Sequence, residues 1–232
     1  MTQTATQSAL VIGASKGLGL ALAGELVKRG RAVTATVRGS GRTGLHDLAD
    51  SSEGRLRVES VDTTAQDQVE ALRTRLAGEA FDLLFINAAI TRGDVPIGEV
   101  STEDFVDVMV TNALSPMRVL EALKELVPPT GTLAIMSSSQ GSVSLNTNGG
   151  QDLYRASKSA LNQLMRSYAA RNADDTRTLL LINPGWVRTE LGGPDALLSI
   201  DQSIPGVVDT LQRHAGEPGL QFLDFQDEVV PW

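Results

Sequence analysis

The sequence predicts a single α/β domain built on a doubly wound parallel β-sheet. Short, continuously apolar runs alternate with amphipathic stretches at helical spacing along almost the whole chain. Uninterrupted apolar strands separated by helices are typical of a parallel sheet that is covered on both faces. The length of 232 residues suits one large domain, and no internal repeat, low-complexity tract or interdomain linker divides it. We therefore expect one domain over residues 1–232.

The predicted strands are short runs rich in Val, Ile, Leu and Thr. In chain order they are Ser8–Ile12, Ala32–Val37, Arg55–Ser60, Phe81–Asn87, Thr132–Ser137 and Arg177–Asn183. The predicted helices are Leu18–Arg29, Asp67–Leu76, Thr102–Val127 and Tyr154–Arg171. A kink or break is expected at Pro116. Loops are expected at the three least regular stretches, Gly39–Gly54, Gly141–Asp152 and Gly192–Pro205.

The composition excludes several classes of protein. Without cysteine the chain has no disulfide, thiolate metal site or cysteine nucleophile, and with only His46 and His214 no metal site is predicted. A net charge of −8 argues against binding to nucleic acid. The first residues carry no Lys or Arg, and no apolar run approaches the ~20 residues of a membrane helix. We therefore expect a cytoplasmic protein with small-molecule partners and no membrane partner.

A glycine-rich turn follows the first predicted strand, on the side of the sheet where ligands of such folds bind. Gly13, Gly17 and Gly19 lie between that strand and the next helix. Glycines allow the backbone to approach a diphosphate, whose charge the helix N-terminus stabilises. The alternative is a turn without a ligand, but a strand before and a helix after are the context that dinucleotide binding requires. We favour a dinucleotide site.

The second predicted strand ends at Val37-Arg38, where NAD-binding versions of this fold usually carry an acidic residue. An arginine suits the 2′-phosphate of NADP instead, and Lys16 in the glycine turn offers a second positive charge to the same phosphate. Both residues could equally be ordinary solvated charges. Together they predict that NADP(H) is preferred, with NAD(H) still possible.

Polar residues also follow the third and fourth predicted strands. The Asp62 carboxylate is placed to meet an adenine amino group, or to cap the following helix. Asn87 is able to bridge backbone groups across a strand end, and Ala88 and Ala89 leave room for a ribose. A plain loop explains this triplet equally well.

The most informative residues follow the fifth strand and open the next helix. Tyr154 and Lys158 are four residues apart, which places them on one helix face. A free tyrosine has a pKa of about 10, and a nearby ammonium lowers that pKa and makes the phenol a usable general acid/base. Ser138 is available to hydrogen-bond the substrate oxygen. In isolation, a surface Tyr–Lys pair is the simpler reading.

Together these residues resemble the short-chain dehydrogenase/reductase family in its single-domain form. The matching motifs, between Ser8 and Thr189, are Gly13…Gly17…Gly19, Asp62, Asn87-Ala88-Ala89, Asn112, Ser138, Tyr154…Lys158 and Pro184-Gly185-Trp186-Val187-Arg188-Thr189. The stretch from Tyr154 to Asn162 and the Pro231-Trp232 pair are similar to the carbonyl-reductase subgroup related to C-factor and sniffer. The chain departs from the family at Ile12, where threonine is frequent, at Ala89, where glycine is usual, and through a longer polar stretch, Ser144–Asp152.

The resemblance implies a sheet of about seven parallel strands and hydride transfer between a nicotinamide and a carbonyl or alcohol. Tyr154 would be the acid/base, Lys158 would lower its pKa and hold the ribose, and Asn112 would hold a water in a proton relay. The implied cofactor contacts are Gly13, Ser15, Lys16, Gly17, Leu18, Gly19, Arg38, Asp62, Asn87, Ala88, Ala89, Tyr154, Lys158, Pro184, Gly185, Val187 and Thr189. The implied substrate contacts are Ser138, Gln140, Tyr154 and Trp186.

Other functions and the assembly remain open at this point. A dinucleotide-binding sensor or signalling protein with lost or secondary catalysis is the alternative function, whereas a nucleotide-sugar epimerase would need an extra domain. An apolar pocket under a lid over residues 192–205 is expected from Trp186, Leu191, Leu197 and Leu198, unless these side chains only pack on the core. A homodimer or homotetramer is expected through the small and apolar residues Ala113, Ala122, Ala160, Leu161, Leu164, Met165 and Ala169, unless they only cover the sheet.

Overall fold

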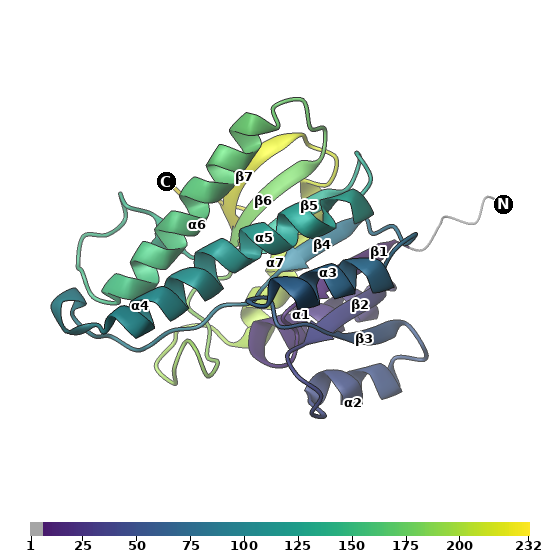
Figure 1. Cartoon of the computed structure of the whole chain (residues 1–232), viewed down its shortest axis with the longest axis horizontal. Helices are drawn as coiled ribbons and strands as arrows, with labels where there is room; N and C mark the ends of the chain where they lie inside the picture. Colours follow the sequence, from purple (N-terminus) through teal and green to yellow (C-terminus); the bar gives the residue numbers. More distant parts are fainter. Residues whose placement is uncertain (1–6) are drawn as a thin grey trace.

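The computed structural model describes residues 7–232, which fold around a parallel sheet in the strand order β3-β2-β1-β4-β5-β6-β7 (Figure 1). The strands are β1 (Ser8–Ile12), β2 (Ala32–Val37), β3 (Leu56–Ser60), β4 (Leu83–Ile86), β5 (Thr132–Met136), β6 (Thr178–Asn183) and β7 (Gly219–Asp224). Each neighbouring pair is parallel. The predicted doubly wound α/β fold is therefore confirmed, and the strand order reverses between β1 and β4, where such folds bind their ligands.

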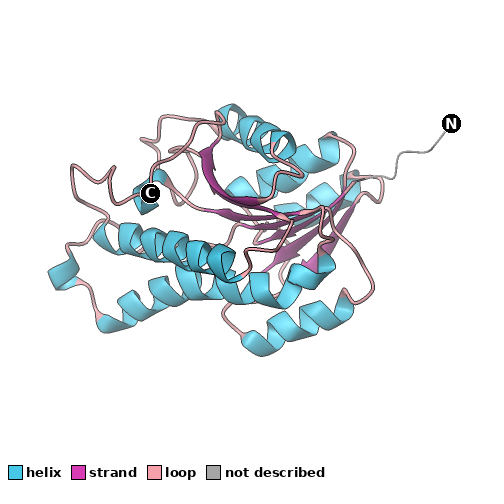
Figure 2. Ribbon diagram, turned by 90° about the horizontal axis from the view of Figure 1, so that it is seen from above, coloured by secondary structure: helices cyan, strands magenta, loops and turns pink. Residues whose placement is uncertain are grey.

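Helices cover both faces of this sheet (Figure 2). They are α1 (Gly17–Lys28), α2 (Gly44–Ser51), α3 (Gln66–Arg75), α4 (Thr102–Met109), α5 (Ser115–Leu123), α6 (Asp152–Arg171) and α7 (Ile200–Arg213). Within residues 7–232, no helix is long and apolar enough to span a membrane.

The alternation of side chains along each strand divides the apolar residues into two cores. In β1, Leu10 and Ile12 join the core under α3, α5 and α6, whereas Ala9 and Val11 join the core under α1, α2 and α7. Successive strand residues point to opposite faces, so a strand covered on both sides must be apolar throughout. This is the physical reason that the apolar runs predicted the strands well.

Two of the expected loops contain helices. Within Gly39–Gly54, α2 begins at a capping box formed by Thr43 and His46. This helix buries the Leu45 side chain in the second core, between the sheet and α1, α2 and α7. The stretch Gly192–Pro205 includes the start of α7, where Ser199 caps the helix and Pro205 lies inside it. The prediction of a lid over residues 192–205 is therefore corrected to a loop that ends at Ser199. Neither helix was predicted, because Gly44 at the start of α2 and Pro205 inside α7 are residue types that usually mark loops.

The predicted helix over Thr102–Val127 is interrupted one turn before Pro116. Between α4 and α5 the chain forms a π-helical turn over Val110–Leu114, and Pro116 lies in the first turn of α5. Proline lacks an N–H and fits the first turn of a helix, so the wider turn just before it absorbs the break. The π-helical turn carries Asn112, one of the predicted site residues.

Candidate active site

The predicted site residues lie beyond the carboxyl ends of the strands or on the helices that begin there, except Asn112, which lies in the π-helical turn between α4 and α5. Because the sheet is parallel, these strand ends share one edge, and α4 and α6 begin at the same side of the molecule (Figure 1). Ser15, Lys16 and Leu18 lie in or just after the turn that joins β1 to α1. The structure therefore brings together segments that are far apart in the sequence.

The glycine turn has the geometry that its sequence predicts. Gly13 and Gly17 have φ angles of +82° and +57°, a region that favours glycine. A Cβ atom at Gly19 would lie 2.2 Å from the Gly13 carbonyl oxygen, so only glycine lets α1 begin this close to the turn. The first turn of α1 contains no acidic residue, which leaves the positive end of the helix available to a diphosphate.

Hydrogen bonds from two neighbouring strands hold this turn in place. Asn87 Nδ2 donates to the Gly13 carbonyl at 2.9 Å, and the Gly13 N–H donates to Thr36 Oγ1 at 3.0 Å. The bridging role predicted for Asn87 is therefore present. Ala88 packs directly on Gly13, where a Cβ would lie 3.0 Å from the Ala88 nitrogen. The role of Thr36 was not predictable, because a threonine within a strand carries no signal of such a contact.

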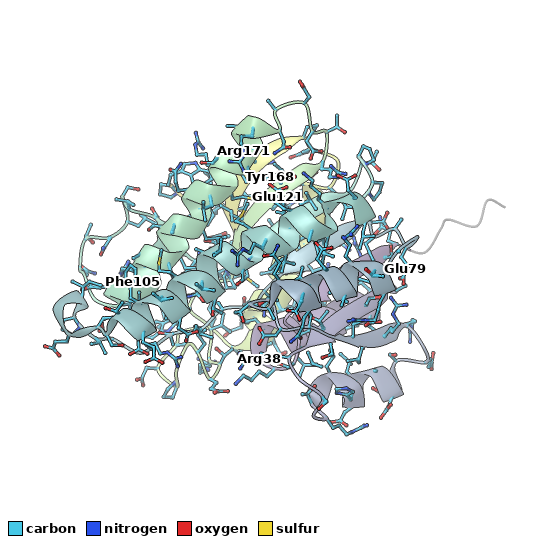
Figure 3. All side chains as sticks on the ribbon, viewed as in Figure 1. Arg38, Glu79, Phe105, Glu121, Tyr168 and Arg171 are labelled. Atoms are coloured by element: carbon cyan, nitrogen blue, oxygen red, sulfur yellow. The ribbon has the colours of Figure 1, made fainter. Side chains whose placement is uncertain are left out.

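Charged residues surround the end of β2. Arg38 is exposed at that strand end (Figure 3). The Asp62 carboxylate accepts hydrogen bonds from the Thr64 N–H at 2.9 Å and the Thr64 hydroxyl at 2.7 Å. Burial raises the pKa of Asp62, but these hydrogen bonds and the charge of Arg38 outweigh it and the pKa is lowered overall. Asp62 thus braces the turn before α3, and its contact with adenine stays a prediction.

The catalytic candidates meet at the start of α6. Lys158 is only 1% exposed, its Nζ donates to the Met136 carbonyl at 3.0 Å, and it lies 5.8 Å from the centroid of the Tyr154 ring. Ser138 precedes a short 3-10 helix (Ser139–Gly141), its Oγ accepts a hydrogen bond from the Gln140 N–H at 3.2 Å, and it lies close enough to the Tyr154 phenol to lower the pKa of that group. Tyr154 and Lys158 therefore lie on the same face of α6, as their spacing predicted. A surface Tyr–Lys pair is ruled out because Lys158 is buried.

Burial dominates the protonation of this pair. It raises the pKa of the Tyr154 phenol to about 12, although the hydrogen bond with Ser138 acts in the opposite direction. Burial also lowers the pKa of Lys158 to about 8. The lowered phenol pKa expected from the sequence is therefore wrong for this structure, because desolvation penalises the phenolate more than its neighbours stabilise it. At neutral pH the phenol holds its proton and is a proton donor.

The segment that carries Ser138 is fixed to α6 by side chains that sequence analysis did not single out. Ser137 Oγ donates to Asn162 Oδ1 at 2.6 Å, and both Asn162 Nδ2 and Ser159 Oγ donate to the Gly141 carbonyl. These bonds set the position of Ser138 relative to the helix that bears Tyr154. Asn162 lies in the stretch from Tyr154 that resembles the carbonyl reductases, and this resemblance was the one sequence signal for its role.

Asn112 is fully buried, and its side-chain amide is used for structure. Its Oδ1 accepts from the Ile90 N–H at 2.8 Å, and its Nδ2 donates to the Ile90 carbonyl at 2.8 Å and to Ser157 Oγ at 3.0 Å. Asn112 thereby joins the segment after β4 to α6. Its predicted role in a proton relay stays a prediction.

The segment after β6 forms a closed loop at the nicotinamide end of the predicted site. Gly185 has φ +77°, and a Cβ there would lie 2.5 Å from Leu198 Cδ1. Val187 forms a bridge with Leu198, so Leu198 packs inward, whereas Leu197 is 76% exposed. Trp186 is half-exposed, and its Nε1 donates to the Gly192 carbonyl at 2.7 Å. Of the four residues predicted to line a pocket, Leu198 packs against Gly185, whereas Trp186, Leu191 and Leu197 are exposed. None of the four belongs to either core, so the pocket stays a prediction.

The long polar stretch Ser144–Asp152 is tied to the segment after β4. The Gln151 N–H donates to Asp94 Oδ1 at 2.5 Å, and the Ile97 N–H donates to Asp152 Oδ2 at 3.2 Å. Two carboxylates therefore hold together the two loops that border the predicted substrate entrance.

Residues 7–196 match the family model of the short chain dehydrogenases. Since this match spans most of the chain, and since the fold and the Ser–Tyr–Lys arrangement agree with the predicted resemblance, the protein belongs to that family.

Several known proteins resemble the chain closely. A short-chain dehydrogenase/reductase from Burkholderia multivorans, solved with bound NADP, is 56% identical with a TM-score of 0.96, and the match covers 98% of this chain and 100% of that one. A carbonyl reductase from Pseudomonas aeruginosa PAO1 in complex with NADP is 34% identical with a TM-score of 0.90, over 98% and 100% of the two chains. C-signal from Myxococcus xanthus is 32% identical over 71% of this chain and 100% of its own length.

Proposed function

We propose that the protein is an NADP(H)-dependent oxidoreductase that interconverts a carbonyl compound and a secondary alcohol, with Tyr154 as the acid/base. The observation that carries the proposal is the position of the Tyr154 phenol beside Ser138 and one helical turn from the buried Lys158, whose Nζ lies 5.8 Å from the centroid of the Tyr154 ring. This arrangement gives a protonated phenol beside a hydroxyl that is able to share the same substrate oxygen. The closely similar proteins solved with NADP support the choice of cofactor.

The residues present fit NADP(H). Glycines with positive φ and the open N-terminus of α1 suit the diphosphate, while Lys16 and Arg38 suit the 2′-phosphate. When bound, the nicotinamide supplies or accepts the hydride. The other predicted cofactor contacts, from Asn87-Ala88-Ala89 and from Pro184 to Thr189, stand at the same edge of the sheet, which supports their assignment.

The chain itself provides the proton. The Ser138 hydroxyl and the Tyr154 phenol donate hydrogen bonds to the substrate carbonyl oxygen, which polarises it toward hydride attack. Tyr154 then gives its proton to the forming alkoxide. Lys158, whose pKa is lowered by burial to about 8, exchanges protons near neutral pH, and in this role it would return the proton to the phenol with a water held near Asn112.

An uncharged carbonyl substrate suits the residues at the entrance. The three arginines there are already engaged: Arg92 with Asp104 and Asp107, Arg155 with the Gly149 and Gly150 carbonyls, and Arg188 with the Ala196 and Leu197 carbonyls. No residue between β5 and α6 is charged. Within residues 7–232, an anionic substrate would therefore find no arginine there that lacks a hydrogen-bond or ion-pair partner.

Two side chains are proposed as substrate contacts. Gln140 Oε1 is buried and has no hydrogen-bond partner among residues 7–232, so it is available to a substrate donor. The half-exposed ring of Trp186 offers an apolar wall at the same entrance.

A homodimer or homotetramer is proposed as the assembly, with a changed set of contacts. Ala113, Leu161 and Met165 are fully buried against the sheet and cannot reach a second subunit, so the alternative reading holds for them. Phe105 on α4 (Figure 3) and Leu164 on α6 are about two-fifths exposed and are the better candidates. Sedimentation at micromolar concentration that shows only a monomer would exclude this assembly.

A cytoplasmic location likewise stays a prediction, to be tested by cell fractionation.

The test of the proposed function compares two tyrosine variants of the same helix. Tyr154→Phe is expected to lower kcat by at least about 100-fold with an uncharged ketone and NADPH, while NADPH binds with the same Kd. Tyr168→Phe is the matched control, because Tyr168 is buried in α6 and its hydroxyl has no partner among the described residues. Full turnover by Tyr154→Phe would reject the assignment.

A signalling or sensor protein is the second candidate, favoured by the match to the whole of C-signal. The two functions are separated by adding a panel of aldehydes, ketones and alcohols to the protein with NADPH or NADP⁺. Turnover of any of these compounds, measured as a change in nicotinamide fluorescence, supports the proposal that the protein is an enzyme. Tight binding of NADPH without turnover across the panel supports the sensor.

A further inference from the structure

Glu190 forms an ion pair with Lys16 across the predicted cofactor site. Lys16 lies in the glycine turn after β1, and Glu190 lies in the loop after β6, so the pair joins two segments far apart in the sequence. The two segments also touch beside the pair, since a Cβ at Gly17 would lie 3.9 Å from Thr189 Cγ2. No feature of the sequence pointed to Glu190, because its partner is 174 residues away.

The backbone that carries Glu190 is held firmly. The Gly193 N–H donates to the Thr189 carbonyl at 2.9 Å, and the Gly192 N–H donates to Thr189 Oγ1 at 3.0 Å. A Cβ at Gly192 would lie 2.1 Å from the Val187 carbonyl oxygen, so this turn is closed around a glycine. The loop therefore presents the Glu190 carboxylate to the glycine turn from a fixed position.

Lys16 is the one cation with which Glu190 forms an ion pair within residues 7–232. Arg188, the nearest arginine in sequence, directs its guanidinium to the Ala196 and Leu197 carbonyls instead. The Lys16 and Glu190 side chains are 70% and 78% exposed, so an incoming anion is able to displace the carboxylate without first unfolding the loop.

We infer that Glu190 sets the selectivity between NADP(H) and NAD(H) by competing with the 2′-phosphate for Lys16. This inference rests on the proposed function, which places that phosphate at Lys16 and Arg38. Binding of NADP(H) exchanges one anionic partner of Lys16 for another and breaks its ion pair with Glu190, which weakens binding. NAD(H) has no 2′-phosphate and leaves the pair intact. Glu190 thus weakens the affinity for NADP(H) alone, which favours release of the product cofactor.

The test measures the Kd of NADPH and NADH by the fluorescence of the dinucleotide for the wild-type protein and Glu190→Gln. Exposed ion pairs contribute up to about 1 kcal/mol, so Glu190→Gln is expected to bind NADPH about twofold to fivefold more tightly, with the Kd of NADH unchanged. The difference should vanish at about 1 M salt, where the Debye length is about 3 Å. Asp195→Asn is the matched control, because Asp195 lies in the same loop and forms no ion pair within the described part of the chain.

The Lys16→Met variant and the Lys16→Met/Glu190→Gln double variant separate this inference from the proposed function. We expect Lys16→Met to weaken NADPH binding and to abolish the effect of Glu190→Gln, as a double-mutant cycle requires for two residues that act through each other. If Lys16→Met leaves the Kd of NADPH unchanged, the placement of the phosphate is wrong and the inference falls with it. If Lys16→Met weakens NADPH binding but Glu190→Gln changes neither Kd, or weakens both dinucleotides equally, the inference alone is overturned.

Discussion

Two glycines of α1, Gly19 and Gly24, provide a sharp test of the cofactor turn. Gly19→Ala places a methyl group 2.2 Å from the Gly13 carbonyl oxygen and 2.6 Å from Asn87 Nδ2, so the backbone of the turn must move. Gly24→Ala, in the same helix, places its methyl group 3.6 Å from Leu48 Cδ2, an ordinary contact. The two substitutions add the same atom to the same helix and differ in what that atom meets.

The expected stabilities follow from these contacts. At Gly19, forced packing costs about 1–3 kcal/mol and loss of the Asn87–Gly13 hydrogen bond about 1 kcal/mol more, against a gain in helix propensity of about 1 kcal/mol. Gly19→Ala should therefore lower the free energy of unfolding by about 1–3 kcal/mol. Gly24→Ala should raise it by about 0.5–1 kcal/mol, since only the gain in propensity remains.

Urea unfolding followed by circular dichroism measures this difference, and a dinucleotide titration measures its effect on the site. Because the Gly13 carbonyl and the turn around it move in Gly19→Ala, the Kd of NADPH should rise at least about tenfold, whereas Gly24→Ala should bind normally. Equal stability of the two variants, with wild-type NADPH binding by Gly19→Ala, would refute the account of this turn.

Three further predictions concern protonation and buried polar groups. Because burial raises the pKa of Tyr154 to about 12, carbonyl reduction should change little between about pH 6 and 7, below the pKa of about 8 of Lys158, whereas alcohol oxidation, which needs the phenolate, should accelerate by up to about tenfold per pH unit in steady-state assays. Burial lowers the pKa of His214, but hydrogen bonds with Glu217 and Asp227 raise it overall. The stabilisation from the charged imidazole is therefore complete below pH 6.5 and lost as the pH rises through the higher folded-state pKa, and urea titrations of His214→Gln should lack this loss. Asn112→Ala removes the three hydrogen bonds of a buried side chain and should lower the free energy of unfolding by about 3 kcal/mol, a value that an unchanged urea midpoint would contradict.

Much of the fold could be read from the sequence because the strands are buried on both faces. The run Ala32–Val37 is apolar throughout apart from two threonines, and the structure gives β2 the same bounds. The strand β7 escaped detection because its residues Gly219, Gln221 and Asp224 interrupt the apolar pattern, and this edge strand is less buried than its neighbours. The helix α2 was missed because it is short and only one of its residues is fully buried.

The site was predictable where chemistry requires a residue type at a fixed spacing, as for Tyr154 and Lys158. It was not predictable where distant polar side chains meet, as for Thr36 under Gly13 and for Glu190 beside Lys16. The direction of the pKa shift of Tyr154 was also beyond the sequence. It depends on how deeply the phenol is buried, and the spacing of two residues does not reveal that depth.

The central claim is that Tyr154 and Ser138 together bind the oxygen atom that gains or loses a proton. A crystal structure with NADP⁺ and an unreactive ketone or alcohol analogue measures this directly. We predict that the substrate oxygen lies within about 3.2 Å of both Tyr154 Oη and Ser138 Oγ, with the nicotinamide ring against the reacting carbon. A substrate oxygen outside hydrogen-bond distance of Tyr154, in a complex that transfers hydride in solution, would contradict the account.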